Sequence, residues 1–143
     1  MRIVFDTNSL IRAHRRIPSR ARSLLEATLD GGHRLLVSNH LLAEVSKVLR
    51  YPRIHDLYGI SEPEIFEYVQ FLQSVSTIVL FDPTYLAPLR DPADLAVLQV
   101  AEHGEADILC TQDADFFDQA VLAYCATLGL EICTEATLAK RLL

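Results

Sequence analysis

The sequence has no tryptophan, one methionine and only three cysteines in 143 residues. No apolar run approaches the roughly 18 to 20 residues that cross a bilayer, and Asp6 interrupts the opening segment before a secretory apolar region could form. Cys110, Cys125 and Cys133 are odd in number and lack Cys-x-x-Cys spacing, which indicates buried reduced thiols. We therefore expect a cytoplasmic protein without a membrane segment.

Glycine-rich phosphate loops are also absent. Neither G-x-G-x-x-G nor G-x-x-x-x-G-K-[ST] occurs, so a nucleotide cofactor has no support from the sequence. The length leaves no room for two cores but suffices for one, which predicts a single domain over residues 1–143.

The net charge of −6 argues against a general nucleic-acid binder, but its distribution is uneven. Residues 1–53 hold ten of the thirteen basic residues and four acids, a net charge of +6, and residues 54–143 carry −12. Such asymmetry is one indication of a polyanionic partner.

Short apolar segments alternate with longer segments of helical period. The segments expected as strands are 3–5, 35–37, 77–81, 107–110 and 130–133, and those expected as helices are 18–30, 39–50, 62–74, 92–104, 116–127 and a last one from 135. This alternation predicts a doubly wound α/β fold, a three-layer α/β/α arrangement around a central, mainly parallel, twisted sheet of about five strands. Ligands of such folds bind at the carboxyl ends of the strands.

Four acids fall at this edge of the expected sheet. Asp6 and Asp113 each follow a strand, Glu44 flanks the apolar stripe of its helix, and Asp94 lies in the first turn of another helix. Each has an ordinary explanation as a helix cap, turn or flank residue. Together, however, they would repel one another without compensation. Oxygen ligands alone favour Mg²⁺ or Mn²⁺, which activate water and stabilise charge on a phosphoryl group.

A cluster of arginines follows Asp6 in the sequence. Its members are Arg12, Arg15, Arg16, Arg20 and Arg22. Arginine at these positions would attract the phosphates of a polyanion toward the acidic edge. A solvated face or a docking patch for an acidic partner protein is the alternative.

These segments resemble the PIN-domain family, in particular the toxins of prokaryotic toxin-antitoxin pairs. The resemblance lies in four blocks, residues 3–8, 38–45, 91–101 and 106–116, in order and at the family's spacing. One departure is Gln112, where the toxin pattern often has glycine, and this could alter the turn that aims Asp113.

The resemblance implies a metal-dependent endoribonuclease that cleaves single-stranded or looped RNA by metal-activated water. It implies a cognate antitoxin, and frequently a homodimer. The ligands of Mg²⁺ or Mn²⁺ would be Asp6, Glu44, Asp94 and Asp113. Four further residues would orient these ligands without binding the metal themselves: Asn8, Asp91, Thr111 and Asp115.

Two other functions stay open. A phosphoaspartyl phosphatase or phosphoacceptor domain also places an Asp after its first strand, but Asn8 replaces the acid that one such class requires. Both types need a lysine near a later strand, whereas Lys47 faces away on its expected helix and Lys140 lies at the C-terminus. A non-catalytic RNA- or protein-binding module of the same fold is the other alternative.

Overall fold

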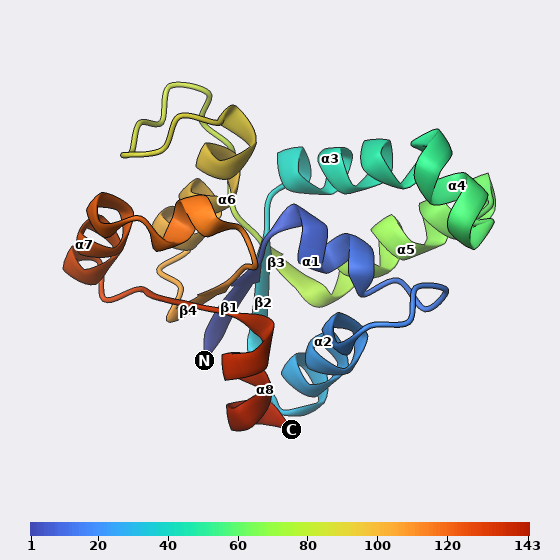
Figure 1. The fold of residues 1–143 in the computed structure, drawn as a ribbon, viewed down its shortest axis with the longest axis horizontal. Coiled ribbons are helices and arrows are strands. Elements are labelled where there is room, and N and C mark those ends of the chain that lie inside the picture. Colours follow the sequence, from blue (N-terminus) through green and yellow to red (C-terminus); the bar gives the residue numbers. More distant parts are fainter.

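Five parallel strands run through the centre of the computed structural model, which describes residues 1–143 (Figure 1). They are β1 (Arg2–Phe5), β2 (Arg34–Val37), β3 (Ser76–Ile78), β4 (Ile108–Cys110) and β5 (Glu131–Cys133). Their order in the sheet is β3-β2-β1-β4-β5, and every neighbouring pair is parallel. The predicted fold class is therefore confirmed.

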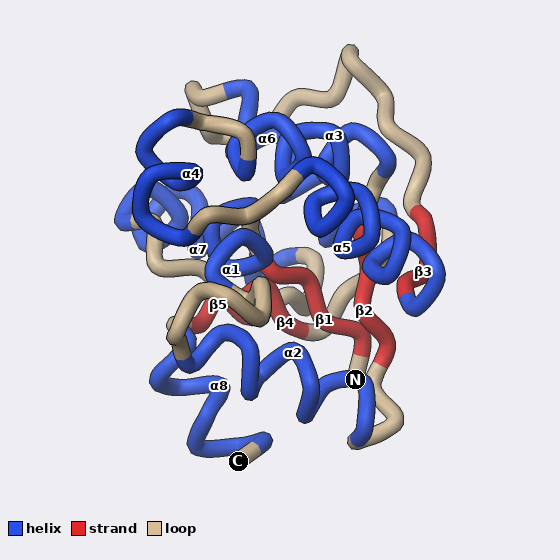
Figure 2. Tube along the Cα trace, turned by 90° about the vertical axis from the view of Figure 1, so that its right-hand side faces the viewer, coloured by secondary structure: helices blue, strands red, loops and turns tan.

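Helices cover both faces of this sheet. They are α1 (Thr7–Arg12), α2 (Arg20–Asp30), α3 (Asn39–Leu49), α4 (Pro52–Tyr58), α5 (Glu62–Val75), α6 (Pro92–His103), α7 (Gln119–Thr127) and α8 (Glu135–Leu142), with a 3-10 helix at Ala114–Phe117. Figure 2 shows α2 and α8 on one side of the strands and the other helices on the opposite side. None of these helices combines the length and the apolarity that a bilayer crossing requires.

The central strands are buried on both faces. Ile3, Val4, Leu36 and Leu109 are all fully inaccessible to solvent, as expected for continuous apolar strands in a parallel sheet. The three cysteines are free thiols and lie in or beside this core. Burial of apolar side chains thus fixes β1 and β4 side by side, and with them the residues that follow each strand.

The strand order changes direction beside β1. From β1 the chain winds outward to β2 and β3, and it then returns to place β4 on the other flank of β1. Asp6 directly follows β1 and Thr111 directly follows β4, so both lie at the position where open α/β sheets bind ligands.

Several local predictions differ from the structure. The helix expected at 116–127 is divided at Asp118, where the 3-10 helix ends and α7 begins. The strand expected at 77–81 ends at Ile78, because its single neighbour β2 ends at Val37 and the chain there turns into α3. Leu80 is accordingly 85% exposed. Helix α4 was not predicted, although Pro52 occupies its first turn and Gly59 ends it at a φ of 60°; its single buried residue, Ile54, gives almost no apolar period.

Gly104 lets the end of α6 approach the sheet closely. A Cβ at this position would lie 2.6 Å from the Val100 carbonyl oxygen and 2.8 Å from Leu36 Cδ1. We predict that Gly104→Ala lowers the free energy of unfolding by about 1 to 3 kcal/mol, because the helix end must shift. Thermal denaturation measures the change.

The adjacent residue provides the control. Glu105 has a φ of 53°, a conformation that glycine adopts without strain. Glu105→Gly should therefore leave the melting temperature unchanged or raise it slightly. A loss of stability in both variants would show that the turn, rather than the close approach at Gly104, is sensitive.

Candidate active site

Five carboxylates line one hollow of about 160 Å³ at the carboxyl edge of the sheet. Its lining residues are Asp6, Thr7, Asn8, Glu44, Val48, Asp91, Ala93, Asp94, Val97 and Asp113. The four acids predicted as ligands therefore all face a common space, and so do Asn8 and Asp91. They reach it from four segments of the chain: the end of β1, helix α3, the start of α6 and the turn after β4.

Asp6 is held by two hydrogen bonds. Its Oδ1 accepts from the backbone N–H of Ser9 at 2.7 Å, so it is the N-cap of α1. Its Oδ2 accepts from the Thr111 hydroxyl at 2.5 Å. Asp6 is 6% exposed, so these two hydrogen bonds hold a nearly buried carboxyl group in one orientation.

Thr111 joins Asp6 to the turn that carries Asp113. While its hydroxyl donates to Asp6, the same oxygen accepts from the backbone N–H of Asp113 at 3.0 Å. Thr111 itself is fully buried. This one hydroxyl group therefore fixes the first and the fourth predicted acids relative to each other.

The tightest group of carboxylates differs from the predicted set. Asp94, Asp113 and Asp115 each offer an oxygen, and these oxygens lie within 4.8 Å of one another. Asp115 was expected only to orient other ligands. Its backbone N–H also donates to Asp113 Oδ1 at 2.9 Å, because Asp113 caps the 3-10 helix that follows. Asp6 and Glu44 line the hollow but do not belong to this group.

The surroundings of Asp94 disfavour the charged form of its carboxyl group. Partial burial is the main cause, and the neighbouring charges of Asp113, Asp91 and Asp115 add to it, so that the pKa of Asp94 rises to about 7. A divalent cation would relieve this repulsion. Asp91 instead accepts a hydrogen bond from the Ala93 N–H at 2.9 Å and caps α6, which is the role that its position in the sequence favoured.

The donor set fits a hard cation. Every charged group in the lining is a carboxylate, with one asparagine and one threonine beside them, and none is histidine, cysteine or lysine. Such oxygen donors suit Mg²⁺ or Mn²⁺ and give no support for zinc. The raised pKa of Asp94, caused first by burial and then by the neighbouring carboxylates, is consistent with such a site.

A supporting network behind Asp6 was missed by sequence reasoning. Glu135, 7% exposed at the start of α8, accepts from the Ser9 hydroxyl at 3.1 Å and pairs with Arg12 at 2.5 Å. The Gln112 side-chain oxygen accepts from the backbone N–H of Glu135 at 2.9 Å. Gln112, which departs from the toxin pattern, thus ties the turn that carries Asp113 to α8. The only sequence signal was a glutamate in the first turn of a helix, which has many ordinary explanations.

The arginine cluster is less free than predicted. Arg12 pairs with Glu135, Arg15 and Arg16 pair with Glu64 from α5, and Arg22 pairs with Glu26 one turn along α2. Arg20 forms no ion pair. The ion pairs of Arg12, Arg15 and Arg16 join residues distant in sequence and offset part of the positive charge of the cluster.

Comparison with known families and structures agrees with this geometry. A model of the PIN domain family matches residues 2–115, and the chain belongs to that family, as its sequence predicted. The comparison with curated proteins gives no match.

Among solved structures, a chain of VapBC2 from Rickettsia felis, bound to a DNA fragment from their promoter, is similar in fold. The two chains are 16% identical, the alignment covers 92% of this chain and 98% of that one, and the TM-score is 0.58. At this identity the likeness concerns the fold.

We predict that Thr111→Val weakens both stability and metal binding. The change leaves a buried Asp6 oxygen without a donor, which costs about 1 to 3 kcal/mol, and loss of an orienting hydrogen bond typically lowers metal affinity about 10- to 100-fold. Thermal denaturation over a Mn²⁺ titration measures both. Thr111→Ser keeps the hydroxyl and is the matched control; equal losses in both variants would refute a role of the hydrogen bonds.

Asp94→Asn is expected to stabilise the metal-free protein at high pH. Because the folded pKa of Asp94 is raised from 3.8 to about 7, the folded state retains this proton more strongly, and the free energy of unfolding falls as pH rises across that interval. Asparagine does not titrate, so the variant should not lose stability in this way as the pH rises. Since Asp94 is partly exposed and screened by solvent, we expect a gain of about 1 kcal/mol, or roughly 3 °C.

The stabilisation of Asp94→Asn relative to wild type should vanish near pH 4. It should reverse when Mn²⁺ is added, because only the wild type is then stabilised by tight metal binding. Melting curves in a chelator at about pH 4 and pH 8, and then with metal, provide the measurement. Asp56→Asn, which removes an exposed carboxylate from α4 that forms no ion pair, controls for loss of charge. The same gain at both pH values would contradict the interpretation.

Proposed function

We propose that the protein is a metal-dependent endoribonuclease that hydrolyses phosphodiester bonds in single-stranded or looped RNA. The observation that carries the proposal is the convergence of Asp6, Glu44, Asp94 and Asp113 on one hollow of a PIN domain. Asp115 is added to the proposed ligands because its carboxylate lies with those of Asp94 and Asp113.

The protein's own groups perform three tasks in this proposal. Asp94, Asp113 and Asp115 hold the cation, with Asp6 and Glu44 completing its surroundings. Thr111 and the Ser9 N–H fix the orientation of the Asp6 carboxyl group. A bound Mg²⁺ or Mn²⁺ ion lowers the pKa of water and stabilises the negative charge that develops on the phosphate. No side chain has to act as nucleophile.

Proton release from Asp94 is coupled to metal binding. Its raised pKa means that the carboxyl group holds a proton near neutral pH in the absence of metal, and a carboxylate must lose that proton to act as a ligand. Metal affinity, and with it activity, should therefore fall as the pH drops below about 7. The phosphate backbone would meet repulsion from the same acids until the cation is in place.

The two alternatives have less support. A phosphoaspartyl enzyme of the types considered above needs a lysine near a later strand, whereas the lining of the hollow contains no lysine. A non-catalytic binding module of this fold has no need for the complete acidic set.

The biological setting is part of the proposal. We propose that the protein is the toxin of a toxin-antitoxin pair, with a cognate antitoxin protein, a homodimeric state and a cytoplasmic location. The likeness in fold to VapBC2 of Rickettsia felis, a toxin-antitoxin complex, supports the partner. Arg20, and the exposed guanidinium groups of Arg15 and Arg16, are the proposed contacts for RNA or for that partner.

A metal-titrated ribonuclease assay tests the activity. Purified wild type should cleave a mixed pool of single-stranded RNA in Mg²⁺ or Mn²⁺ and not in a chelator. Asp94→Asn should lose at least about 100-fold of the rate, more than the loss typical for residues that only orient ligands. The charge-matched control Asp56→Asn should cleave like wild type.

A wild type that neither cleaves RNA nor gains melting temperature at millimolar metal would reject the nuclease and favour the binding module. Transfer of phosphate from a small phosphodonor to Asp6 would instead favour the phosphoaspartyl alternative. Equal activity in wild type and Asp94→Asn would assign the cleavage to a contaminant.

A further inference from the structure

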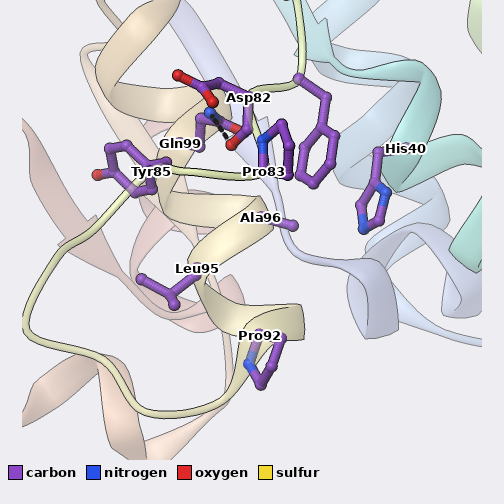
Figure 3. Close-up of a pocket in the computed structure, with 9 residues that line it drawn as sticks. His40, Asp82, Pro83, Tyr85, Pro92, Leu95, Ala96 and Gln99 are labelled. Carbon is purple, nitrogen blue, oxygen red and sulfur yellow. Dashed lines mark hydrogen bonds between the residues drawn. The ribbon is translucent and has the colours of Figure 1, made fainter.

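A second hollow of about 160 Å³ adjoins the acidic one. Its lining residues are His40, Phe81, Asp82, Pro83, Tyr85, Pro92, Leu95, Ala96 and Gln99 (Figure 3). None of them lines the hollow that contains Asp6 and Asp94. Its volume is similar to that of a cavity of about 150 Å³ known to accommodate a benzene ring.

Helices α3 and α6 contribute residues to both hollows. On α3, His40 precedes Glu44 by four residues, so the two side chains lie on one face about 6 Å apart along the axis. In the first turns of α6, Ala93 and Asp94 face the acidic hollow, whereas Pro92 and Leu95 face the second one. A ligand in the second hollow therefore lies beside the acids.

One wall of this hollow is a stacked aromatic pair. The rings of His40 and Phe81 are nearly parallel, at an angle of 4°, with centroids 3.9 Å apart. His40 is exposed at the start of α3, and Phe81 is 41% exposed. Phe81 reaches this place because β3 ends early and the segment after it leaves the sheet. The pair offers a flat aromatic surface to solvent.

The chemistry of the lining excludes an anion. It contains no arginine or lysine, and its one carboxylate, Asp82, accepts hydrogen bonds from the backbone and hydroxyl of Thr84. Proline, leucine and alanine side chains complete the walls. A phosphate group would find no arginine or lysine here, but a flat uncharged ring would find apolar contacts and a stacking partner.

Gln99 adds a polar group to the floor. Its side-chain N–H donates to the Asp82 carbonyl oxygen at 2.9 Å, and the amide is 1% exposed. Figure 3 shows this bond, which holds the Gln99 side chain against the segment after β3.

We propose that this hollow is a nucleobase subsite, in which an unpaired RNA base stacks against the His40–Phe81 pair while the neighbouring phosphate lies at the acids. The proposal rests on the proposed nuclease function. The separation of about 6 Å along α3 corresponds to about two steps of 3.4 Å along a stacked strand. The recognised base is therefore one or two nucleotides from the cleaved bond.

Abasic scanning of an RNA substrate tests the subsite. A series of oligonucleotides, each lacking one base near the cleavage point, is cleaved by wild type, by Phe81→Ala and by Phe81→Tyr. In wild type, one abasic position should lower kcat/KM about 5- to 150-fold, the equivalent of about 1 to 3 kcal/mol for one stacked base. In Phe81→Ala the intact RNA should be cleaved correspondingly more slowly, and the same abasic position should have little further effect.

Phe81→Tyr keeps the ring and should retain the abasic effect. Phe66→Ala, which removes an exposed phenyl ring from α5, is the matched control and should behave like wild type. Melting curves of all variants verify that they fold, so that a loss of cleavage is not a loss of structure.

The outcomes separate this proposal from the nuclease itself. No cleavage by wild type rejects the proposed function. Cleavage with an abasic effect that is equal in wild type and Phe81→Ala rejects the subsite alone. Cleavage that is insensitive to every abasic position also rejects it, and leaves an apolar side chain of a protein partner as the occupant of the hollow.

Discussion

The Thr111 hydroxyl group is the interaction on which the acidic edge depends. It lies between the ends of β1 and β4, donates to Asp6 and accepts from the N–H of Asp113. The two strands are brought together by burial of apolar residues, but that burial alone leaves the orientation of the following side chains undetermined. The buried Thr111 hydroxyl group therefore fixes the Asp6 carboxyl group relative to the turn that carries Asp113.

The acids at this edge have structural and chemical roles at once. Asp6, Asp91 and Asp113 each cap a helix, so local backbone N–H groups already stabilise their negative charge. Asp94 does not cap a helix, and its pKa is raised by partial burial and by repulsion from the neighbouring carboxylates. The capping interpretation and the ligand interpretation of these residues are thus compatible, because one carboxylate has several lone pairs to offer.

The sequence predicted the parts that depend on local pattern. Continuous apolar strands and helical periods defined the layers, and position after a strand was enough to find Asp6 and Asp113. Helix α4 and the end of β3 were missed because a short exposed helix has little period and a strand ends where its neighbour does. The ion pairs of Arg12 and Arg16, and the membership of Asp115 in the cluster, depend on contacts between segments and could not be inferred from spacing.

Helix α8 lies beyond the residues 2–115 that match the family model, yet it contacts the acidic edge from behind. Through Glu135 it holds Ser9, the N–H donor to Asp6, and the N–H of Glu135 holds the turn that carries Asp113. Helix α8 therefore supports two of the acids from outside the hollow. The geometry of the carboxylates thus depends on a segment that the family model does not cover.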